Sequence, residues 1–506
     1  MSNWMSLSPF TIDKSSSRPL YRQIAESLAD QIRSGGISAG TLLPPTRKLV
    51  EIFQVNRSTA VAAYEALEKQ GLVRSKVGRG TEVLAPEVLA SDRTERIWDE
   101  RSSAGLRLLV RQMDDLSGEP LTVTDQVCDF SRLAPDTSLF PVEPLRSSLN
   151  SALDQSRGEI LQYGSGQGYA PLRETISTRM KKFGVAEDPD RIVIVSGAQQ
   201  GLDLILRAFA SPADGVAVET PTYSGILPLL GLGQLDVLPV PMTPEGADLD
   251  RLEQIIVTKK LRLFYTMPSF HNPTGITTSR EHRHRLTQLA RTHGFLIIED
   301  GFEDELGFGA ETPRPLCGID PGGAILYLGT FSKGLFPGVR VGWISGEPDA
   351  IRRLAALKSG IDYGAPLLLQ AAVDDLCRTG EYDRHLTHLR KVYSGRRKAL
   401  AKAFEKHLPA SCRSRFPEGG FAVWIDLPSR VSADQVARET ALEGVYVSPA
   451  SRFTPAGMAP VSGLRLSVSR VGNWEIDRGI KILGRIITRL IQQGERSSRA
   501  AAVPTL

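Results

Sequence analysis

The chain has 506 residues, of which 41% are hydrophobic and 23% charged, a composition typical of soluble globular proteins rather than disordered or fibrous ones. At ~150 residues per domain, this length predicts roughly three folding units. No run of eighteen apolar residues occurs and the N-terminus lacks the pattern of a secretory signal, so no membrane association is expected. Four cysteines lie far apart without metal-ligand spacing, which suits a reducing cytoplasm and indicates no metal site.

The positive charge is concentrated in the first part of the chain. Residues 1–85 carry eleven Lys or Arg and seven Asp or Glu, an excess of four that equals the net charge of the whole chain. The rest of the chain is therefore neutral overall. A basic N-terminal unit favours a polyanionic partner, although a modest basic patch is also commonly just a solvated face.

Three helices followed by a hairpin are predicted within residues 18–85. Apolar residues recur every four positions over 20–32, and further helical patterns cover 46–53 and 57–70. Residues 72–83 alternate apolar and polar side chains around a Gly-X-Gly tip, which is typical of a β-hairpin. This order of elements predicts a winged helix-turn-helix.

Basic and hydroxyl side chains gather at the positions where such a unit would meet DNA. The third helix begins with residues able to donate hydrogen bonds to phosphates or base edges, and the preceding helix and the hairpin add basic residues. A winged helix that docks another protein, or a solvated basic face, is the alternative interpretation. The expected DNA contacts are Arg47, Arg57, Ser58, Thr59, Lys76 and Arg79.

The unit resembles the DNA-binding domain of GntR-type bacterial regulators in the string LPPTRKLVEIFQVNRSTAVAAYEALEKQGLVRSKVGRGTEV. The resemblance covers essentially all of residues 18–85 and implies double-stranded operator DNA as a partner. One position departs, because family members often carry another basic residue just after the Ser-Thr pair, where this chain has Val61. The base preference therefore cannot be transferred from the family.

Four segments are expected along the chain. The DNA-binding unit is assigned to residues 14–85, and a partly structured linker to 86–124, where the hydrophobic pattern weakens. Residues 125–493 alternate short apolar runs with amphipathic stretches, which predicts parallel strands separated by helices and hence an α/β domain. Residues 494–506 are expected to be a disordered tail.

Five motifs in the α/β domain follow predicted strands, where ligands of such sheets bind. Small residues over 196–200 open a helix whose N-terminus favours an anion such as phosphate. Tyr223 lies at the end of a predicted connection between strands. Asn272 follows a strand, and Asp300 lies at the end of the next one. Lys333 follows a further strand, within Gly-Thr-Phe-Ser-Lys-Gly. Each signal alone is weak, because small-residue turns and solvated lysines are common outside binding sites.

In this order the motifs resemble the fold-type-I pyridoxal-phosphate enzymes of the class I aminotransferase family, over almost all of residues 125–493. The resemblance implies a mostly parallel sheet, a smaller C-terminal subdomain and pyridoxal 5′-phosphate as the cofactor. It implies that Lys333 forms the Schiff base, that Asp300 keeps the pyridine nitrogen protonated and that Arg465 clamps a ligand carboxylate. The other implied cofactor contacts are Ala198, Gln199, Tyr223, Asn272, Thr330, Ser332 and Arg340, with Tyr163 reaching the phosphate from the other subunit of a dimer.

One position departs from this second family. Where its members usually have Asp-X-Tyr, this chain has Asp300-Gly301-Phe302, so the phenol that would share the cofactor's ring hydroxyl with Asn272 is missing. Cofactor binding is expected to survive, because the lysine, the aspartate and the phosphate contacts are present. Efficient transamination is less assured, and whether the chain works as an enzyme stays open.

A GntR-like head joined to an aminotransferase-like body resembles the MocR-type bacterial transcription regulators, from residue 18 to about 493. The resemblance implies a cytoplasmic, nucleoid-associated protein that forms a head-to-tail homodimer. We expect it to sense an amino acid or related amine through aldimine exchange at Lys333. Two alternatives remain: a cytoplasmic aminotransferase with a vestigial head, and a sensor of pyridoxal phosphate itself that controls vitamin B6 synthesis.

Overall fold

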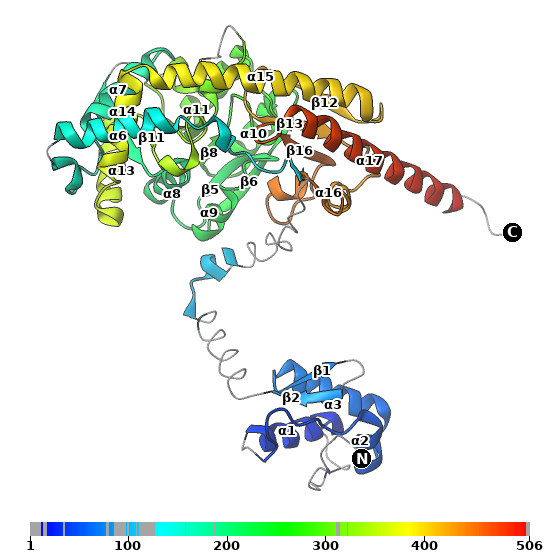
Figure 1. Ribbon diagram of the computed structural model, residues 1–506. Coiled ribbons are helices and arrows are strands. Elements are labelled where there is room, and N and C mark those ends of the chain that lie inside the picture. Colours follow the sequence, from blue (N-terminus) through cyan, green and yellow to red (C-terminus); the bar gives the residue numbers. More distant parts are fainter. Residues whose placement is uncertain are drawn as a thin grey trace. The chain divides into compact units, whose positions relative to one another are not determined.

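The computed structural model divides into two compact units, Met1–Arg107 and Leu108–Leu506 (Figure 1). In the part of the chain that it describes, no helix is long and apolar enough to cross a bilayer, and no three His, Cys, Asp or Glu side chains lie together as a metal would require. Most of the linker expected over 86–124 lies outside the described part. The described residues are 12–13, 18–33, 36–76, 80–84, 98, 101–107, 109–110, 127–156, 158–185, 188–309, 314–320 and 322–501.

The N-terminal unit is the winged helix-turn-helix that the sequence predicts. Its apolar helix faces meet in one core, in which Leu28, Leu49 and Leu67 are fully buried. The two strands of the wing pair antiparallel, with Lys76 opposite Gly80. Its elements are α1 (Leu20–Arg33), α2 (Thr46–Phe53), α3 (Arg57–Lys69), β1 (Val73–Lys76) and β2 (Gly80–Val83).

The C-terminal unit is built on an eight-stranded sheet. Its strands are β4 (Ile192–Val195), β5 (Gly215–Thr220), β6 (Asp236–Thr243), β7 (Gly246–Ala247), β8 (Leu261–Thr266), β9 (Leu296–Asp300), β10 (Ile325–Thr330) and β11 (Gly342–Ser345). Their spatial order is β4-β11-β10-β9-β8-β5-β6-β7. Neighbours from β10 to β6 pair parallel, whereas β11 and β7 run antiparallel to the strands beside them. The mostly parallel α/β sheet is therefore confirmed.

Helices cover both faces of this sheet (Figure 1). Because successive strand residues point to opposite faces, Ile194 and Ile297 enter one hydrophobic core while Val193 and Ile298 enter the other. One face is covered by α7 (Ala170–Lys181), α10 (Leu249–Thr258), α11 (Arg280–His293) and α14 (Leu367–Arg378), and the other by α8 (Ala198–Phe209), α9 (Leu227–Leu232) and α13 (Pro348–Asp362). This double burial explains the continuous apolar runs in the sequence.

A smaller subdomain follows the long helix α15 (Glu381–His407), as expected. Its antiparallel sheet has the order β12-β13-β16-β15 and shares a core with its helices. Its elements are β12 (Arg413–Arg415), β13 (Ala422–Asp426), β15 (Ser448–Pro449), β16 (Gly463–Ser467), α16 (Ala433–Ala441) and α17 (Asn473–Ala501). The same core includes the N-terminal strand β3 (Cys128–Asp129), which pairs parallel with β14 (Val445–Tyr446).

The C-terminal helix corrects one expectation. The sequence predicts a disordered tail over 494–506, whereas α17 continues to Ala501; residues 502–506 lie outside the described part of the chain. The apolar stripe of this helix packs on the subdomain as far as Leu490 and Ile491. Most of the residues that follow, apart from Gly494, have moderate to high helix propensity, so the helix extends beyond its last packed turn.

Candidate functional site

The carboxyl ends of several strands of the large sheet meet at one cavity of about 250 Å³. The polar motifs that the sequence places after these strands therefore lie together, as expected for an open α/β sheet. All the cofactor residues expected from the sequence line this cavity, apart from Tyr163. The lining residues are Leu133, Ala198, Gln199, Tyr223, Met267, Asn272, Asp300, Phe302, Thr330, Ser332, Lys333, Arg340 and Arg465.

Tyr163 lies on the surface of its own chain. Its side chain is 87% exposed, and its ring centre lies 6.2 Å from that of Tyr363. The role expected for Tyr163 requires a second subunit, so it stays a prediction.

One end of the cavity is suited to an anion. Gly197 adopts a φ of 85° directly before α8, so the first N–H groups of this helix and its positive dipole end face the cavity. The Nη2 of Arg340 donates to the carbonyl oxygen of Ser196 at 2.6 Å, which holds the guanidinium beside this helix end. Within the described residues, the buried Oγ of Ser332 has no hydrogen-bond partner. A guanidinium, the positive end of a helix dipole and a hydroxyl without a partner among the described residues therefore meet here.

Gln199 and Tyr223 are linked by their side chains. The Nε2 of Gln199 donates to the carbonyl oxygen of Gly225 at 2.6 Å, and its Oε1 accepts from the hydroxyl of Tyr223 at 3.3 Å. A Cβ at Gly225 would lie 2.4 Å from the tyrosine ring, so only glycine allows this approach. The side chain of Gln199 therefore positions the ring of Tyr223, and its backbone N–H is the group left to face an anion.

Asp300 lines the cavity with a carboxylate that is only partly paired among the described residues. Its Oδ2 accepts a hydrogen bond from the hydroxyl of Tyr265 at 2.7 Å, whereas its buried Oδ1 has no partner among the described residues. Burial raises the pKa of Asp300 to about 7. An unpaired buried carboxylate is costly unless a donor arrives, so a ligand N–H would be stabilising here. The sequence does not reveal Tyr265, because it ends an apolar run that indicates only a core strand.

Lys333 projects into the cavity from the loop after β10. Its amine donates to the carbonyl oxygen of Leu133 at 2.6 Å. Burial lowers the pKa of Lys333, which increases the fraction of the neutral, nucleophilic amine. Leu133 lies far from Lys333 in the sequence, and no local pattern indicates this contact.

Arg465 is buried in the lining of the same cavity. Its Nη1 donates to Oδ1 of Asn272 at 3.2 Å, its Nη2 contacts Ser448 Oγ and the carbonyl of Ser131, and its guanidinium lies 4.9 Å from the ring centre of Phe453. Its buried Nε has no partner within the described part of the chain. Burial lowers the pKa of Arg465 to about 10. Because Asn272 uses its carbonyl for the arginine, its NH₂ group is left to donate to a ligand.

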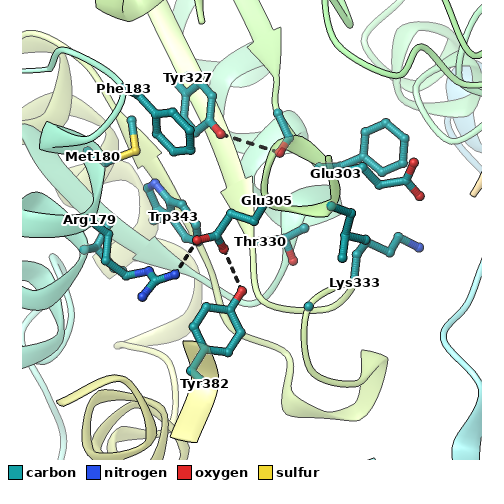
Figure 2. A pocket seen from close by; sticks show the side chains of 15 residues that line it. Arg179, Met180, Phe183, Glu303, Glu305, Tyr327, Thr330, Lys333, Trp343 and Tyr382 are labelled. Carbon is teal, nitrogen blue, oxygen red and sulfur yellow. Dashed lines mark hydrogen bonds and ion pairs between the residues drawn. The ribbon is translucent and has the colours of Figure 1, made fainter. Parts of the chain in front are cut away.

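A second, smaller cavity of about 20 Å³ lies beside Lys333 (Figure 2). Phe302, Glu303 and Lys333 line it, together with an ion pair between Arg179 and Glu305. The ring of Phe302 is 8% exposed and brings no hydroxyl to either cavity. The sequence reasoning misses Glu303, although this carboxylate follows Asp300 by three positions.

In the N-terminal unit, the expected DNA contacts lie at the start of α3 and nearby. Asn56 caps this helix: its Oδ1 accepts from the backbone N–H of Thr59 at 2.8 Å and from the hydroxyls of Ser58 and Thr59. Arg57 and Ser58 are exposed, as is Arg47 on α2. Arg79 and the side chain of Lys76 lie outside the described residues.

Comparison with known proteins accounts for both units. The model of bacterial regulatory proteins, gntR family, matches residues 20–83, and that of aminotransferase class I and II matches residues 136–483. The chain is 30% identical to YdfD of Bacillus subtilis, an uncharacterised HTH-type transcriptional regulator, over 93% of this chain and 97% of that protein. It is 28% identical to MocR of Rhizobium meliloti, a probable rhizopine catabolism regulatory protein, over 87% and 88%.

A solved structure extends the comparison to the cavity-bearing unit. LysN of Thermus thermophilus, an α-aminoadipate aminotransferase, matches with a TM-score of 0.71 and 32% identity, over 78% of this chain and 99% of that chain. The likeness to YdfD and MocR spans both units, because it covers 93% and 87% of this chain, whereas that to LysN covers 78%. The chain therefore belongs to the class I and II aminotransferase family and, through its GntR-type DNA-binding domain, to the MocR-type transcriptional regulators.

Proposed function

We propose that this protein binds promoter DNA and pyridoxal 5′-phosphate and regulates transcription in response to an amino acid or related amine. The GntR-type domain implies DNA binding, and the aminotransferase fold implies the cofactor. The observation that carries the proposal is the cavity in which Asp300, Lys333, Arg340 and Arg465 meet.

The residues of this cavity fit the cofactor at three points. The start of α8, Arg340 and the free hydroxyl of Ser332 suit its phosphate, and the unpaired oxygen of Asp300 suits a protonated ring nitrogen. The amine of Lys333 suits its aldehyde. When bound, pyridoxal phosphate supplies an aldehyde for condensation with amines and a ring that withdraws electrons.

The remaining cavity residues would hold the cofactor in place. Tyr223, positioned by Gln199, would stack on its ring, and the NH₂ group of Asn272 would donate to its ring hydroxyl. The backbone N–H groups of Ala198 and Gln199 and the side chain of Thr330 would complete the phosphate contacts. In a head-to-tail homodimer, Tyr163 would reach the phosphate of the other subunit.

The same cavity offers a place for an amino-group ligand. We infer that the ligand's amine takes the place of the Lys333 amine, while Arg465 binds a ligand carboxylate through its donors. Sensing requires that the ligand bind one arrangement of the dimer better than another. A coupling of ~1–3 kcal/mol between the ligand site and DNA affinity would suffice.

DNA would be recognised through the winged helix. Arg57, Ser58 and Thr59, at the first turn of α3, would contact bases and phosphates, and Arg47 a phosphate. Lys76 and Arg79 would bring the wing to the DNA backbone. The rest of the chain carries no net charge, so the net positive charge that would attract DNA comes from this unit.

The test combines absorption spectra with DNA binding by the full chain. Purified protein would be titrated with pyridoxal phosphate, and the affinity for its own promoter DNA measured by fluorescence anisotropy with and without cofactor and a set of amines. We expect a visible absorption band, an amine that changes both the band and the DNA affinity, and the loss of both responses in Lys333→Ala. Lys391→Ala, which changes an exposed lysine, should behave like the native protein.

Three outcomes would contradict the proposal or favour another function. An unchanged ligand response in Lys333→Ala would refute sensing at this lysine. A change in DNA affinity with cofactor alone would favour a sensor of pyridoxal phosphate. Fast steady turnover with common amino donors would favour an aminotransferase, the second candidate, which the intact Lys333, Asp300 and Arg465 support.

A further inference from the structure

Glu303 is a buried acid that none of the roles above uses. It follows β9 and is 2% exposed. Its Oε2 accepts a hydrogen bond from the backbone N–H of Phe421 at 3.1 Å. A Cβ at Gly420, where φ is 70°, would lie 2.4 Å from the same oxygen, so the loop before β13 packs directly against this carboxylate. One oxygen is therefore held by the backbone.

The other oxygen of Glu303 has no partner in the described part of the chain. The buried Oε1 makes no hydrogen bond to any described residue. Glu303 and Lys333 both line the cavity of about 20 Å³, and in Figure 2 their carboxylate and amine point in the same direction, away from Arg179 and Tyr382. One water molecule between two such groups is enough to connect an acid to an amine by hydrogen bonds.

The charges around this carboxylate indicate which group it serves. Glu303 faces Lys333 after β10, Arg465 on β16, Asp300 on β9 and Tyr393 on α15. Burial raises the pKa of Glu303, and among the charged groups Lys333 opposes this rise most. In return, Glu303 is the charged group that most favours the ammonium form of Lys333. Arg465 is already bound by Asn272, Ser448 and Ser131.

We propose that Glu303 is the proton-holding partner of Lys333: its free oxygen stabilises the lysine ammonium whenever that amine is not joined to the cofactor. This inference deepens the proposed function and rests on it for the identity of the cofactor.

The proton balance of ligand exchange explains why such a group is needed. The bond between the ligand nitrogen and the aldehyde carbon forms, and the bond between Lys333 Nζ and that carbon breaks. The ligand arrives as an ammonium and must lose one proton before it attacks, and the released lysine gains one. Glu303 accepts the first proton and returns it to Lys333, so the overall proton count does not change.

The test uses the full chain without cofactor, so that it does not depend on loading. Lys333 would be labelled with trinitrobenzenesulfonate across a pH series and its peptide quantified by mass spectrometry. In Glu303→Gln the midpoint of Lys333 labelling should fall by roughly one pH unit or more, because a neighbouring negative charge is lost. Labelling below the midpoint should then be about tenfold faster.

Two matched variants separate this role from a structural one. Glu303→Asp keeps the charge with a shorter reach, so its midpoint should lie between those of the native protein and Glu303→Gln. Glu418→Gln removes a carboxylate that is 76% exposed, close to the loop that covers Glu303, and should leave the midpoint in place. If Glu303→Gln fails to fold, the midpoint in Glu303→Asp decides the question.

The result is distinguishable from failure of the proposed function. A native protein that takes up no pyridoxal phosphate, but whose Lys333 midpoint falls in Glu303→Gln, would refute the function and support the pairing. A protein that takes up the cofactor, but whose Lys333 midpoint stays unchanged in Glu303→Gln, would refute the pairing alone. In the loaded protein, Glu303→Gln should also alter the pH profile of the amine-dependent absorption change.

Discussion

The buried carboxylate of Asp300 should destabilise the cofactor-free protein as the pH rises. Burial raises its pKa from an ordinary value of 3.8 to about 7, and the residue is 3% exposed. A difference of about three pKa units corresponds to about 4 kcal/mol. Because a raised acid pKa penalises the ionised form, stability is lost as the pH rises above 3.8, and the loss is complete near pH 7.

Asp300→Asn should remove this cost. The amide keeps a carbonyl for the hydroxyl of Tyr265 but places an NH₂ group where Oδ1 has no partner among the described residues, which costs about 1–3 kcal/mol. At pH 8 the cofactor-free variant should therefore be more stable than the native protein by roughly 1–3 kcal/mol. At pH 5 the native penalty falls to about 2 kcal/mol, so the two proteins should have similar stability.

Thermal unfolding at pH 5 and pH 8, followed by circular dichroism, measures this difference. Asp236→Asn, which changes a half-exposed aspartate, is the control and should show no comparable dependence on pH. With pyridoxal phosphate added at pH 8, the native protein should become more stable than Asp300→Asn, because the ionised Asp300 then pairs with the ring nitrogen. An advantage of Asp300→Asn that is equal at both pH values would refute the reasoning, since burial of charge would then not be its cause.

Three further predictions concern the cofactor and DNA. In Gly197→Ala, the new Cβ would lie 2.6 Å from Nη2 of Arg340, so the guanidinium must move and cofactor affinity, measured by absorbance titration, should fall roughly tenfold to a hundredfold. Phe302→Tyr should place a hydroxyl near Asn272, change the pH at which the cofactor band shifts and increase transaminase turnover. The last prediction concerns DNA affinity, measured by anisotropy titrations at several salt concentrations. Lys76→Ala should weaken binding to all DNA sequences similarly and should reduce the slope of log affinity against log salt concentration by about 0.9. Arg57→Ala should weaken binding to specific sites most.

Each of these has a clear contradicting result. Native cofactor affinity in Gly197→Ala would show that Arg340 is not needed at the start of α8. If the pH dependence of the cofactor band were unaltered in Phe302→Tyr, the side chain at this position would not interact with the cofactor ring. If Arg57→Ala lost equal affinity for specific and random DNA, Arg57 at the start of α3 would not contribute to base recognition.

Much of the fold follows from local patterns. The helices of the winged unit appear where the apolar period indicates them, because one face of each helix must be buried whatever its partner. The strands of the large sheet appear as short apolar runs, since both of their faces are covered. The end of α17 was less predictable: it depends on packing as far as Ile491 and on residues of moderate to high helix propensity beyond it.

The sequence by itself determined the order of elements and the types of residue at the strand ends, because these are properties of neighbouring positions. Only the tertiary structure decided which polar atoms are paired and which are left unpaired. Tyr265 occupies one oxygen of Asp300, and the loop at Phe421 occupies one oxygen of Glu303. Such contacts join segments far apart in the chain, and burial makes each remaining unpaired atom costly. The chemistry of the site therefore depends on how distant segments pack, which no local pattern records.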